Sequence, residues 1–221
     1  MTIMLGQGVY SVAEAARLTG LKPARIREWF RGRTRQHSRK PVFLGDYEPV
    51  DGDFAISFLD LIDVFVAGQL RDHGVLLQTL RRVYERMKKD LGTPHPFCRR
   101  ELLSDGKTVF TRNVDADGKE ELFEALTGQG VFPDIILPFL QRIDYDQATT
   151  VAKRWQIADQ VVIDPNICFG KPAVGKLGIA TAILAAAYKA NGEDAELVAS
   201  WYDVHPDQIL AAVRFEEKLA A

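Results

Sequence analysis

Residues Gly170 to Lys176 fit the spacing Gly-x-x-x-x-Gly-Lys, which is typical of loops that hold the phosphates of a nucleotide. In such loops the residue after the lysine is a serine or threonine that binds Mg²⁺, but here it is Leu177. Pro172 also removes a backbone N–H from a loop that must point its N–H groups at phosphate. The pattern therefore does not favour nucleotide hydrolysis.

Carboxylates and histidines are the other side chains that could carry out hydrolysis. Four aspartates could suggest a metal-dependent nuclease, but no ordered ligand spacing follows them; they are Asp144, Asp146, Asp159 and Asp164. The histidines are scattered, and the two cysteines, Cys98 and Cys168, are too few for a disulfide framework. We expect a protein that is not an enzyme, with no catalytic residues, no metal and no cofactor.

Positive charge is concentrated at the start of the chain. Residues 1–40 contain nine Lys or Arg and two Glu, whereas the whole chain of 221 residues has a net charge of −2. The remaining residues are therefore acidic overall. This asymmetry favours a polyanion such as DNA as the partner of the N-terminal segment. A solvated basic surface that binds nothing is the alternative.

The same segment has the pattern of two short helices joined by a tight turn. Ser11 and Glu14 form a capping-box signature, which predicts a helix start, and Gly20 predicts the turn that ends this helix. Pro23 suits the first turn of a second helix, in which Trp29 and Phe30 are expected in the core. This arrangement matches the helix-turn-helix motif.

The second predicted helix carries cations that could reach bases or phosphates from the major groove. A basic stretch follows it, and residues 41–57 predict a β-hairpin with Asp51–Gly52 as its turn, in the position of a wing. We expect the DNA-binding residues to be Lys22, Arg25, Arg27 and Arg31 on the helix, and Arg33, Arg35, Arg39 and Lys40 around the wing.

Two further helices are predicted, from Ser57 to Leu70 and from Leu76 to Met87. With them, residues 1–90 resemble the DNA-binding domain of MerR-type regulators. The resemblance implies a winged helix-turn-helix that acts as a homodimer on a near-palindromic operator DNA. The metal sensing of that family does not carry over, because Cys98 stands alone, and a lone cysteine is usually inert.

Residues 91–158 mix short helical and strand patterns. A hairpin is predicted around residues 104–106, a helix from Lys119 to Leu126, and a strand near residues 150–155; a further strand is predicted just beyond this segment, at residues 161–163. We expect residues 91–158 to be a small α+β connector that could contribute to dimerisation.

Residues 159–221 predict three short helices in a trihelical, homeodomain-like unit, so the chain as a whole is expected to be mainly α, of the α+β class. Ile183 and Leu184 belong to the apolar pattern of the first helix, and Leu197 and Trp201 to that of the second. With Ile163-Asp164-Pro165 and Gly170-Lys171-Pro172, this segment resembles the small bacterial family catalogued as domain of unknown function 433. One departure is Lys176-Leu177-Gly178, which stands where that family usually has Gly-Thr-Arg.

Proteins of that family resemble antitoxins of type II toxin–antitoxin modules, which are encoded beside a PIN-like ribonuclease toxin. The combined resemblances imply a VapB-type antitoxin that represses its own operon and inhibits the toxin. A cation of the C-terminal domain is expected to reach the carboxylates of the toxin's metal site. The expected toxin-binding residues are Lys171, Lys176, Trp201 and Arg214.

A stand-alone MerR-like transcriptional regulator that senses a small effector is the alternative. In either case we expect a cytoplasmic protein without a membrane partner. The first residues lack the basic region of a signal peptide, and the longest apolar stretch, Gly178 to Tyr188, falls short of the roughly 20 residues that span a bilayer.

Overall fold

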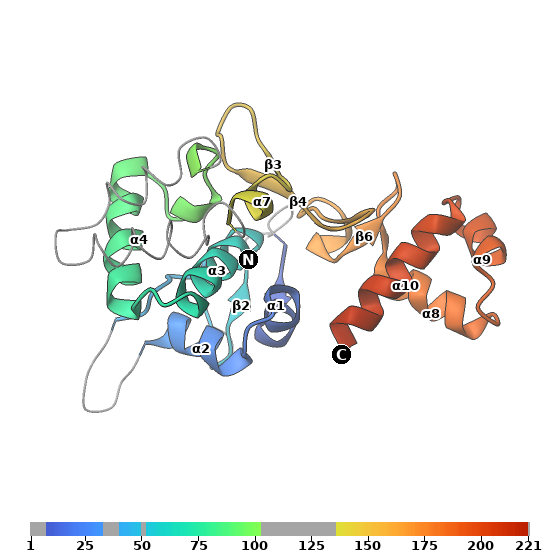
Figure 1. Cartoon of the computed structure of the whole chain (residues 1–221), viewed down its shortest axis with the longest axis horizontal. Coiled ribbons are helices and arrows are strands. Elements are labelled where there is room, and N and C mark those ends of the chain that lie inside the picture. The colour runs from blue at the N-terminus through green and yellow to red at the C-terminus, as the bar shows by residue number, and fades with distance from the viewer. Residues whose placement is uncertain (1–7, 33–39, 50–51, 103–135, 221) are drawn as a thin grey trace. The chain divides into compact units, whose positions relative to one another are not determined.

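The computed structural model describes residues 8–32, 40–49, 52–102 and 136–220, which form two compact units (Figure 1). The N-terminal unit comprises residues 10–152, and the C-terminal unit comprises residues 153–221 with the first nine residues of the chain. Helices and antiparallel strands are both present, so the predicted α+β class is confirmed. None of the helices in these ranges combines the length and apolar character that a bilayer span requires.

The division between the units falls after residue 152. The described parts of the expected connector that precede this point, residues 91–102 and 136–152, belong to the N-terminal unit. A connector that folds as a separate domain therefore stays a prediction.

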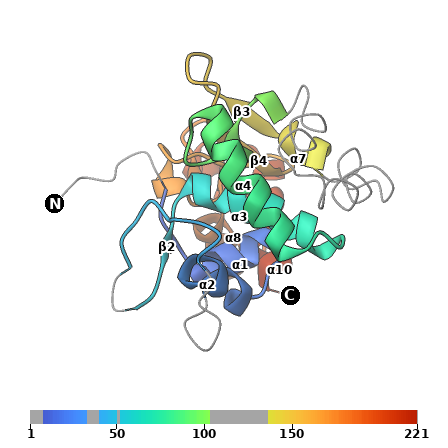
Figure 2. The same cartoon turned by 90° about the vertical axis from the view of Figure 1, so that its left-hand side faces the viewer.

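Helices α1 (Val12–Thr19) and α2 (Pro23–Arg31) form the predicted pair of short helices at the start of the chain (Figure 2). The predicted capping box is present, because the Ser11 hydroxyl accepts from the Glu14 backbone N–H and the Glu14 carboxylate accepts from the Ser11 N–H. Gly20 ends α1 with a φ of 74°, a left-handed conformation that favours glycine. The apolar residues that α2 buries are Ile26, Trp29 and Phe30.

The segment that follows α2 packs back against it. The backbone N–H groups of Val42 and Phe43 donate to the Trp29 carbonyl, with N–O distances of 2.7 and 3.3 Å. Strand β2 (Ala55–Ile56) then pairs antiparallel with β1 (Tyr10–Ser11). In the part of the chain that the structure describes, β2 therefore pairs with the N-terminal strand and not with residues 41–49 of the expected wing. The expected turn residue Asp51 lies outside the described residues.

Two longer helices complete the core of the N-terminal unit. Helix α3 (Phe58–Asp72) begins with the predicted capping box of Ser57 and Asp60, and it ends where the sequence predicts, at His73. Helix α4 (Leu77–Leu91) covers the second predicted span. The largest fully buried side chains in these two helices are Phe58, Leu61, Ile62, Leu70, Leu80 and Met87.

Among the described residues, the rest of the N-terminal unit consists of short elements: η1 (Pro96–Cys98), α7 (Leu137–Leu140) and β3 (Ile143–Tyr145). They dock through aromatic contacts. The Tyr84 ring meets Phe43 and Phe97 edge-on, with centroid distances of 4.9 and 5.1 Å. Phe65 of α3 stacks on Phe139 of α7 at 4.0 Å. The predicted hairpin at 104–106 and the predicted helix from Lys119 to Leu126 lie outside the described residues.

The C-terminal unit begins with short strands, each of which pairs antiparallel with the next. They are β4 (Ala152–Ala158), β5 (Val161–Ile163), β6 (Ala173–Val174) and β7 (Ile179–Ala180), and η3 (Cys168–Gly170) lies between β5 and β6. The helices that follow are α8 (Thr181–Ala190), α9 (Ala195–Tyr202) and α10 (Pro206–Ala220). Helix α10 contacts both α8 and α9, so the predicted trihelical arrangement is present.

The apolar faces of α8 and α9 differ from the predicted ones. Leu184 and Val198 are fully buried, whereas Ile183, Leu197 and Trp201 are 52%, 41% and 55% exposed. The sequence of α8, TAILAAAYKA, is nearly all small or apolar, so it contains no polar face that would identify the buried side. Contact with α10 selects that side instead.

Truncation of two neighbouring residues of α8 tests this assignment. We expect Leu184→Ala to lower the free energy of unfolding by about 2–5 kcal/mol, because it opens a cavity in the core. Ile183→Ala removes an exposed side chain and should cost less than about 1 kcal/mol. Denaturant unfolding followed by circular dichroism measures both. An effect of Ile183→Ala as large as that of Leu184→Ala would contradict the structure.

Candidate functional site

Helix α2 presents the cations that the sequence assigns to DNA binding. Lys22 is the exposed N-cap residue, and Arg31 is exposed at the last turn, where its Nη2 donates to the Gly52 carbonyl at 3.0 Å. Arg25 forms an ion pair with Asp72, and Arg27 Nε lies 3.4 Å from Asp53 Oδ1. Ion pairs this exposed are weak, so a phosphate could replace either carboxylate.

Of the four cations expected around the wing, only Lys40 falls within the described residues; Arg33, Arg35 and Arg39 lie outside them. Lys40 borders a groove of about 460 Å³ in the N-terminal unit, which combines apolar and basic side chains. The groove is lined by Lys40, Pro41, Val42, Leu44, Arg81, Arg82 and Glu85.

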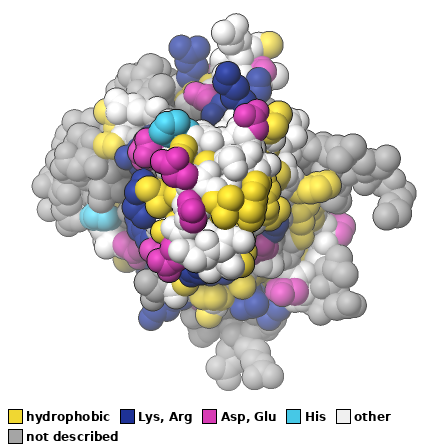
Figure 3. Space-filling model, turned by 90° about the vertical axis from the view of Figure 1, so that its right-hand side faces the viewer, with side chains coloured by type: hydrophobic (Ala, Val, Ile, Leu, Met, Phe, Trp, Pro, Cys, Tyr) yellow, Lys and Arg dark blue, Asp and Glu magenta, His cyan; other side chains and the backbone are white. Residues whose placement is uncertain are grey.

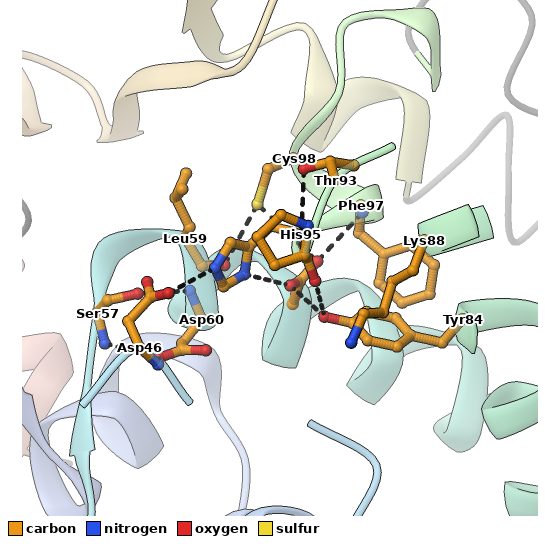
Figure 4. A network of polar contacts seen from close by, with 12 residues as sticks. Asp46, Ser57, Leu59, Asp60, Tyr84, Lys88, Thr93, His95, Phe97 and Cys98 are labelled. Atoms are coloured by element: carbon orange, nitrogen blue, oxygen red, sulfur yellow. Dashed lines mark hydrogen bonds and ion pairs between the residues drawn. The ribbon is translucent and has the colours of Figure 1, made fainter. Parts of the chain in front are cut away.

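A buried histidine joins distant segments of the N-terminal unit (Figure 4). His95 Nε2 lies 2.9 Å from Asp46 Oδ1, and His95 Nδ1 lies 2.8 Å from Asp63 Oδ2. The His95 side chain is 3% exposed and that of Asp63 is 0% exposed. Because each ring nitrogen lies at hydrogen-bond distance from a carboxylate oxygen, we infer that both nitrogens carry a proton and that the ring is an imidazolium ion.

The Asp63 carboxylate accepts hydrogen bonds from several elements. The Tyr84 hydroxyl donates to Asp63 Oδ2 at 2.7 Å, and the Phe97 backbone N–H donates to Oδ1 at 3.1 Å. The thiol of Cys98 lies 3.9 Å from the same Oδ1. A buried carboxylate needs this many partners to offset the loss of water. The network therefore ties α3, α4 and the segment after α4 together.

The pKa values in the network follow from burial and from these contacts. Burial alone would lower the pKa of His95, but its hydrogen bonds to Asp46 and Asp63 outweigh burial and raise the pKa from 6.5 to about 10. Burial raises the pKa of Asp60 to about 6. Burial also raises the pKa of the Cys98 thiol well above its ordinary value. Cys98 is thus a fully buried thiol whose neutral form is favoured.

Asp46, Asp60 and His95 are also the described residues that could best hold a metal ion. Each offers one ligand atom, and these atoms all lie within 4.8 Å of one another. A metal would have to displace a carboxylate from His95, because both ring nitrogens already have partners at hydrogen-bond distance. The arrangement therefore favours a buried ion-pair network over a metal centre.

The buried network was not predicted from the sequence. A signal was present, because Asp60 and Asp63 interrupt the apolar run FLDLIDVF three residues apart, on one side of a helix that buries both. The histidine that contacts Asp63, His95, lies 32 residues further along the chain, and its second partner, Asp46, is 49 residues from it. Nothing in the sequence links these positions.

The residues expected to bind a toxin lie in two loops and on two helices of the C-terminal unit. Lys171 follows η3 and is partly buried, and Lys176 is exposed between β6 and β7. Trp201 is exposed on α9, and Arg214 is exposed on α10. Figure 3 shows hydrophobic side chains gathered on the side of the molecule where α9 lies, with acidic side chains next to them.

The segment with phosphate-loop spacing does not form such a loop. Ala173 and Val174 form strand β6, and α8 begins only at Thr181, after a second strand. The Thr181 backbone N–H donates to the Pro172 carbonyl at 2.9 Å, and its hydroxyl donates to Glu216. The stretch from Gly170 to Pro172 thus anchors the start of α8.

Two comparisons identify what this architecture is similar to. Residues 161–215 match the family described as protein of unknown function (DUF433), so the resemblance of this segment is confirmed. The crystal structure of Rv2018 from Mycobacterium tuberculosis is similar over 96% of this chain and 100% of that one, with a TM-score of 0.73 and 22% sequence identity. At this identity the likeness shows a shared fold. No curated protein matches the chain.

The pH dependence of stability tests the network. The pKa of His95 is about 10 in the folded protein and 6.5 in the unfolded chain, so the proton on His95 stabilises the folded state. This contribution is complete below pH 6.5 and is lost as the pH rises toward 10. We therefore expect the free energy of unfolding to fall between pH 6.5 and 9. At higher pH, ionisation of the Cys98 thiol in the unfolded chain also lowers the free energy of unfolding, so the measurement stops at pH 9. Chemical denaturation at a series of pH values measures this slope.

The double variant Asp63→Asn with His95→Gln, which is neutral at both positions, should lack the slope. His205→Ala, a change at an exposed histidine, should keep it. A wild-type stability that stays constant from pH 6.5 to 9 would show that His95 is not a buried imidazolium ion.

Proposed function

We propose that the protein is an antitoxin of a type II toxin–antitoxin module. In this proposal the N-terminal unit acts as a MerR-like winged helix-turn-helix that binds operator DNA as a homodimer and represses the operon. The C-terminal unit binds and inhibits a PIN-like ribonuclease. The match of residues 161–215 to DUF433, in a chain whose other unit carries a basic helix, is the observation on which the proposal rests.

The DNA-binding part is supported by the form of α2. The helix buries Ile26, Trp29 and Phe30 on one side and places Lys22 and Arg31 in solvent. A short helix anchored by aromatic residues and basic on its outer side fits the major groove.

The toxin-binding part is supported by exposed apolar side chains in the C-terminal unit. Trp201 is 55% exposed on α9, and tryptophan is among the residues that contribute most to binding in protein interfaces. Residues 193–207 contain five acidic residues and no Lys or Arg, so this part of the unit repels nucleic acid. A protein partner suits such a surface better than DNA does.

The groove beside Lys40 supports the alternative function, a MerR-like regulator that senses a small effector. Its volume of about 460 Å³ is in the range of small-molecule sites, and its Lys40, Arg81 and Arg82 side chains would suit an anion with an apolar part. An effector of this kind would bind the N-terminal unit without a second protein.

Salt-dependent DNA binding tests the role of α2. We expect Lys22→Ala to weaken binding to the duplex upstream of the gene and to reduce the slope of log K against log salt by about one unit, because one phosphate contact is lost. Arg33→Ala with Arg35→Ala should reduce it by about two units. Fluorescence anisotropy at several salt concentrations measures both.

Lys189→Ala is the matched control, because Lys189 is an exposed cation on α8 of the other unit. If Lys22→Ala and the double variant bind with the affinity and salt slope of the wild type, the assignment of these cations to DNA binding is wrong.

Co-expression with the products of the adjacent open reading frames tests the antitoxin function. We expect one product to be a PIN-like ribonuclease that co-purifies with this chain and loses its ability to cleave RNA. Trp201→Ala and Arg214→Ala should weaken the complex. Lys218→Ala, which changes another exposed cation of α10, should not. A chain that purifies alone, and whose DNA affinity changes with a metabolite, would favour the effector-sensing regulator.

A further inference from the structure

The groove beside Lys40 is formed by two packed segments of the N-terminal unit. One wall belongs to residues 40–44, the segment that follows α2, and the other wall belongs to α4. The buried Phe43 ring joins the two walls, because it meets the buried Tyr84 ring of α4 edge-on at a centroid distance of 4.9 Å. The walls of this groove of about 460 Å³ are thus held in place before a ligand binds, which lowers the cost of binding.

The lining of the groove combines apolar surface with an excess of positive charge. Leu44 is 68% exposed, so its side chain offers apolar surface to an occupant. The described residues that line the groove include three cations, which are Lys40, Arg81 and Arg82. They outnumber the Glu85 carboxylate, whose Oε1 also lies 3.9 Å from the Lys88 ammonium nitrogen. Such a lining is complementary to an occupant that is both anionic and apolar.

The groove is connected to the helix that is expected to bind DNA. The backbone N–H groups of Val42 and Phe43 donate to the Trp29 carbonyl of α2. The Phe43 ring also contacts the Trp29 and Phe30 rings, with centroid distances of 5.9 and 5.5 Å. One wall of the groove is therefore fixed to the C-terminal end of α2.

Lys40 belongs both to the groove and to the proposed DNA-binding surface. It lines the groove, and it is exposed at the start of the segment that follows the basic stretch after α2. An anion that pairs with Lys40 in the groove removes this ammonium group from DNA phosphates, and it also reduces the positive charge next to α2. Both effects weaken the attraction between the N-terminal unit and DNA.

We propose that the groove is a regulatory site for a small organic anion with an apolar ring, and that this ligand and operator DNA compete for the protein. The anionic group of the ligand pairs with Lys40 and Arg82, and its ring lies on Pro41 and Leu44. The inference rests on the proposed DNA binding. It applies to an antitoxin that represses its operon as well as to a stand-alone regulator, because the site lies entirely in the N-terminal unit.

Ligand binding is tested with the full-length chain and anilinonaphthalene sulfonate, a fluorescent anion with apolar rings. Leu44→Asp and Arg82→Glu should each weaken its saturable binding at least fivefold, because the first removes apolar surface and the second reverses a charge of the lining. The matched controls Leu76→Asp and Lys89→Glu make the same changes at exposed residues outside the lining, and they should change the affinity less than twofold. Circular dichroism should show that all four variants are folded.

Competition is tested with the duplex upstream of the gene. Saturating anilinonaphthalene sulfonate should weaken the binding of the wild-type chain to this duplex, and the duplex should weaken binding of the probe by the same factor, because coupling between two ligands is reciprocal. The probe should reduce the DNA affinity of Lys40→Ala by a smaller factor, since this variant lacks the shared ammonium group.

Three results would contradict the inference in different ways. If Leu44→Asp and Arg82→Glu bind the probe like the wild type, the groove is not the ligand site. If these variants lose the probe but the probe does not change the DNA affinity of the wild type, the competition is wrong. If the wild-type chain does not bind the duplex, the proposed DNA binding and the competition both fail, while the two groove variants still decide whether the ligand site exists.

Discussion

The N-terminal unit depends on one buried positive charge. The His95 imidazolium ion connects Asp46, from the segment after α2, with Asp63 in α3, and Tyr84 of α4 donates to the same Asp63. Without that ion, Asp63 would be an uncompensated charge in an apolar interior, which is strongly unfavourable. Asp46 lies on the segment whose backbone also donates two hydrogen bonds to Trp29 of α2. The position of the basic helix is therefore coupled to a network that includes none of the cations expected to bind DNA.

Features determined by neighbouring residues were predictable from the sequence. The capping boxes at Ser11 and Ser57 and the left-handed Gly20 depend on residues at most three positions away, and the structure contains all of them. The buried network depends on residues 32 and 49 positions apart. Sequence alone identifies polar residues in an apolar run, but their partners are determined by the tertiary fold. The same limit explains why β2 was assigned to a wing hairpin, although within the described residues it pairs with β1.

The C-terminal unit shows a second limit of sequence reasoning. The turn at Asn191-Gly192 and the Asp194 cap mark where α8 ends and α9 begins. The buried faces of α8 and α9, in contrast, do not follow from periodicity, because these helices are apolar on most sides. Ile183, Leu197 and Trp201 fit the helical repeat and are nevertheless exposed. An apolar residue in a small unit has two uses, packing and recognition, and the sequence pattern does not distinguish them. Only the position of α10 reveals which residues remain for a partner.

The ion pairs of α2 affect how the proposed DNA binding would work. Arg25 and Arg27 are paired with Asp72 and Asp53, and the arginine side chains are 39% and 40% exposed. Free protein therefore presents less positive charge than the sequence of α2 suggests, which weakens its attraction to arbitrary polyanions. An operator that brings phosphates close to both arginines replaces their carboxylate partners with phosphates. Each new arginine–phosphate contact offsets part of the free energy lost when the ion pair breaks. Because the ion pairs must break before phosphates can take their place, binding favours a duplex whose phosphates lie close to both arginines. Lys22 remains available for the first contact between the protein and the DNA.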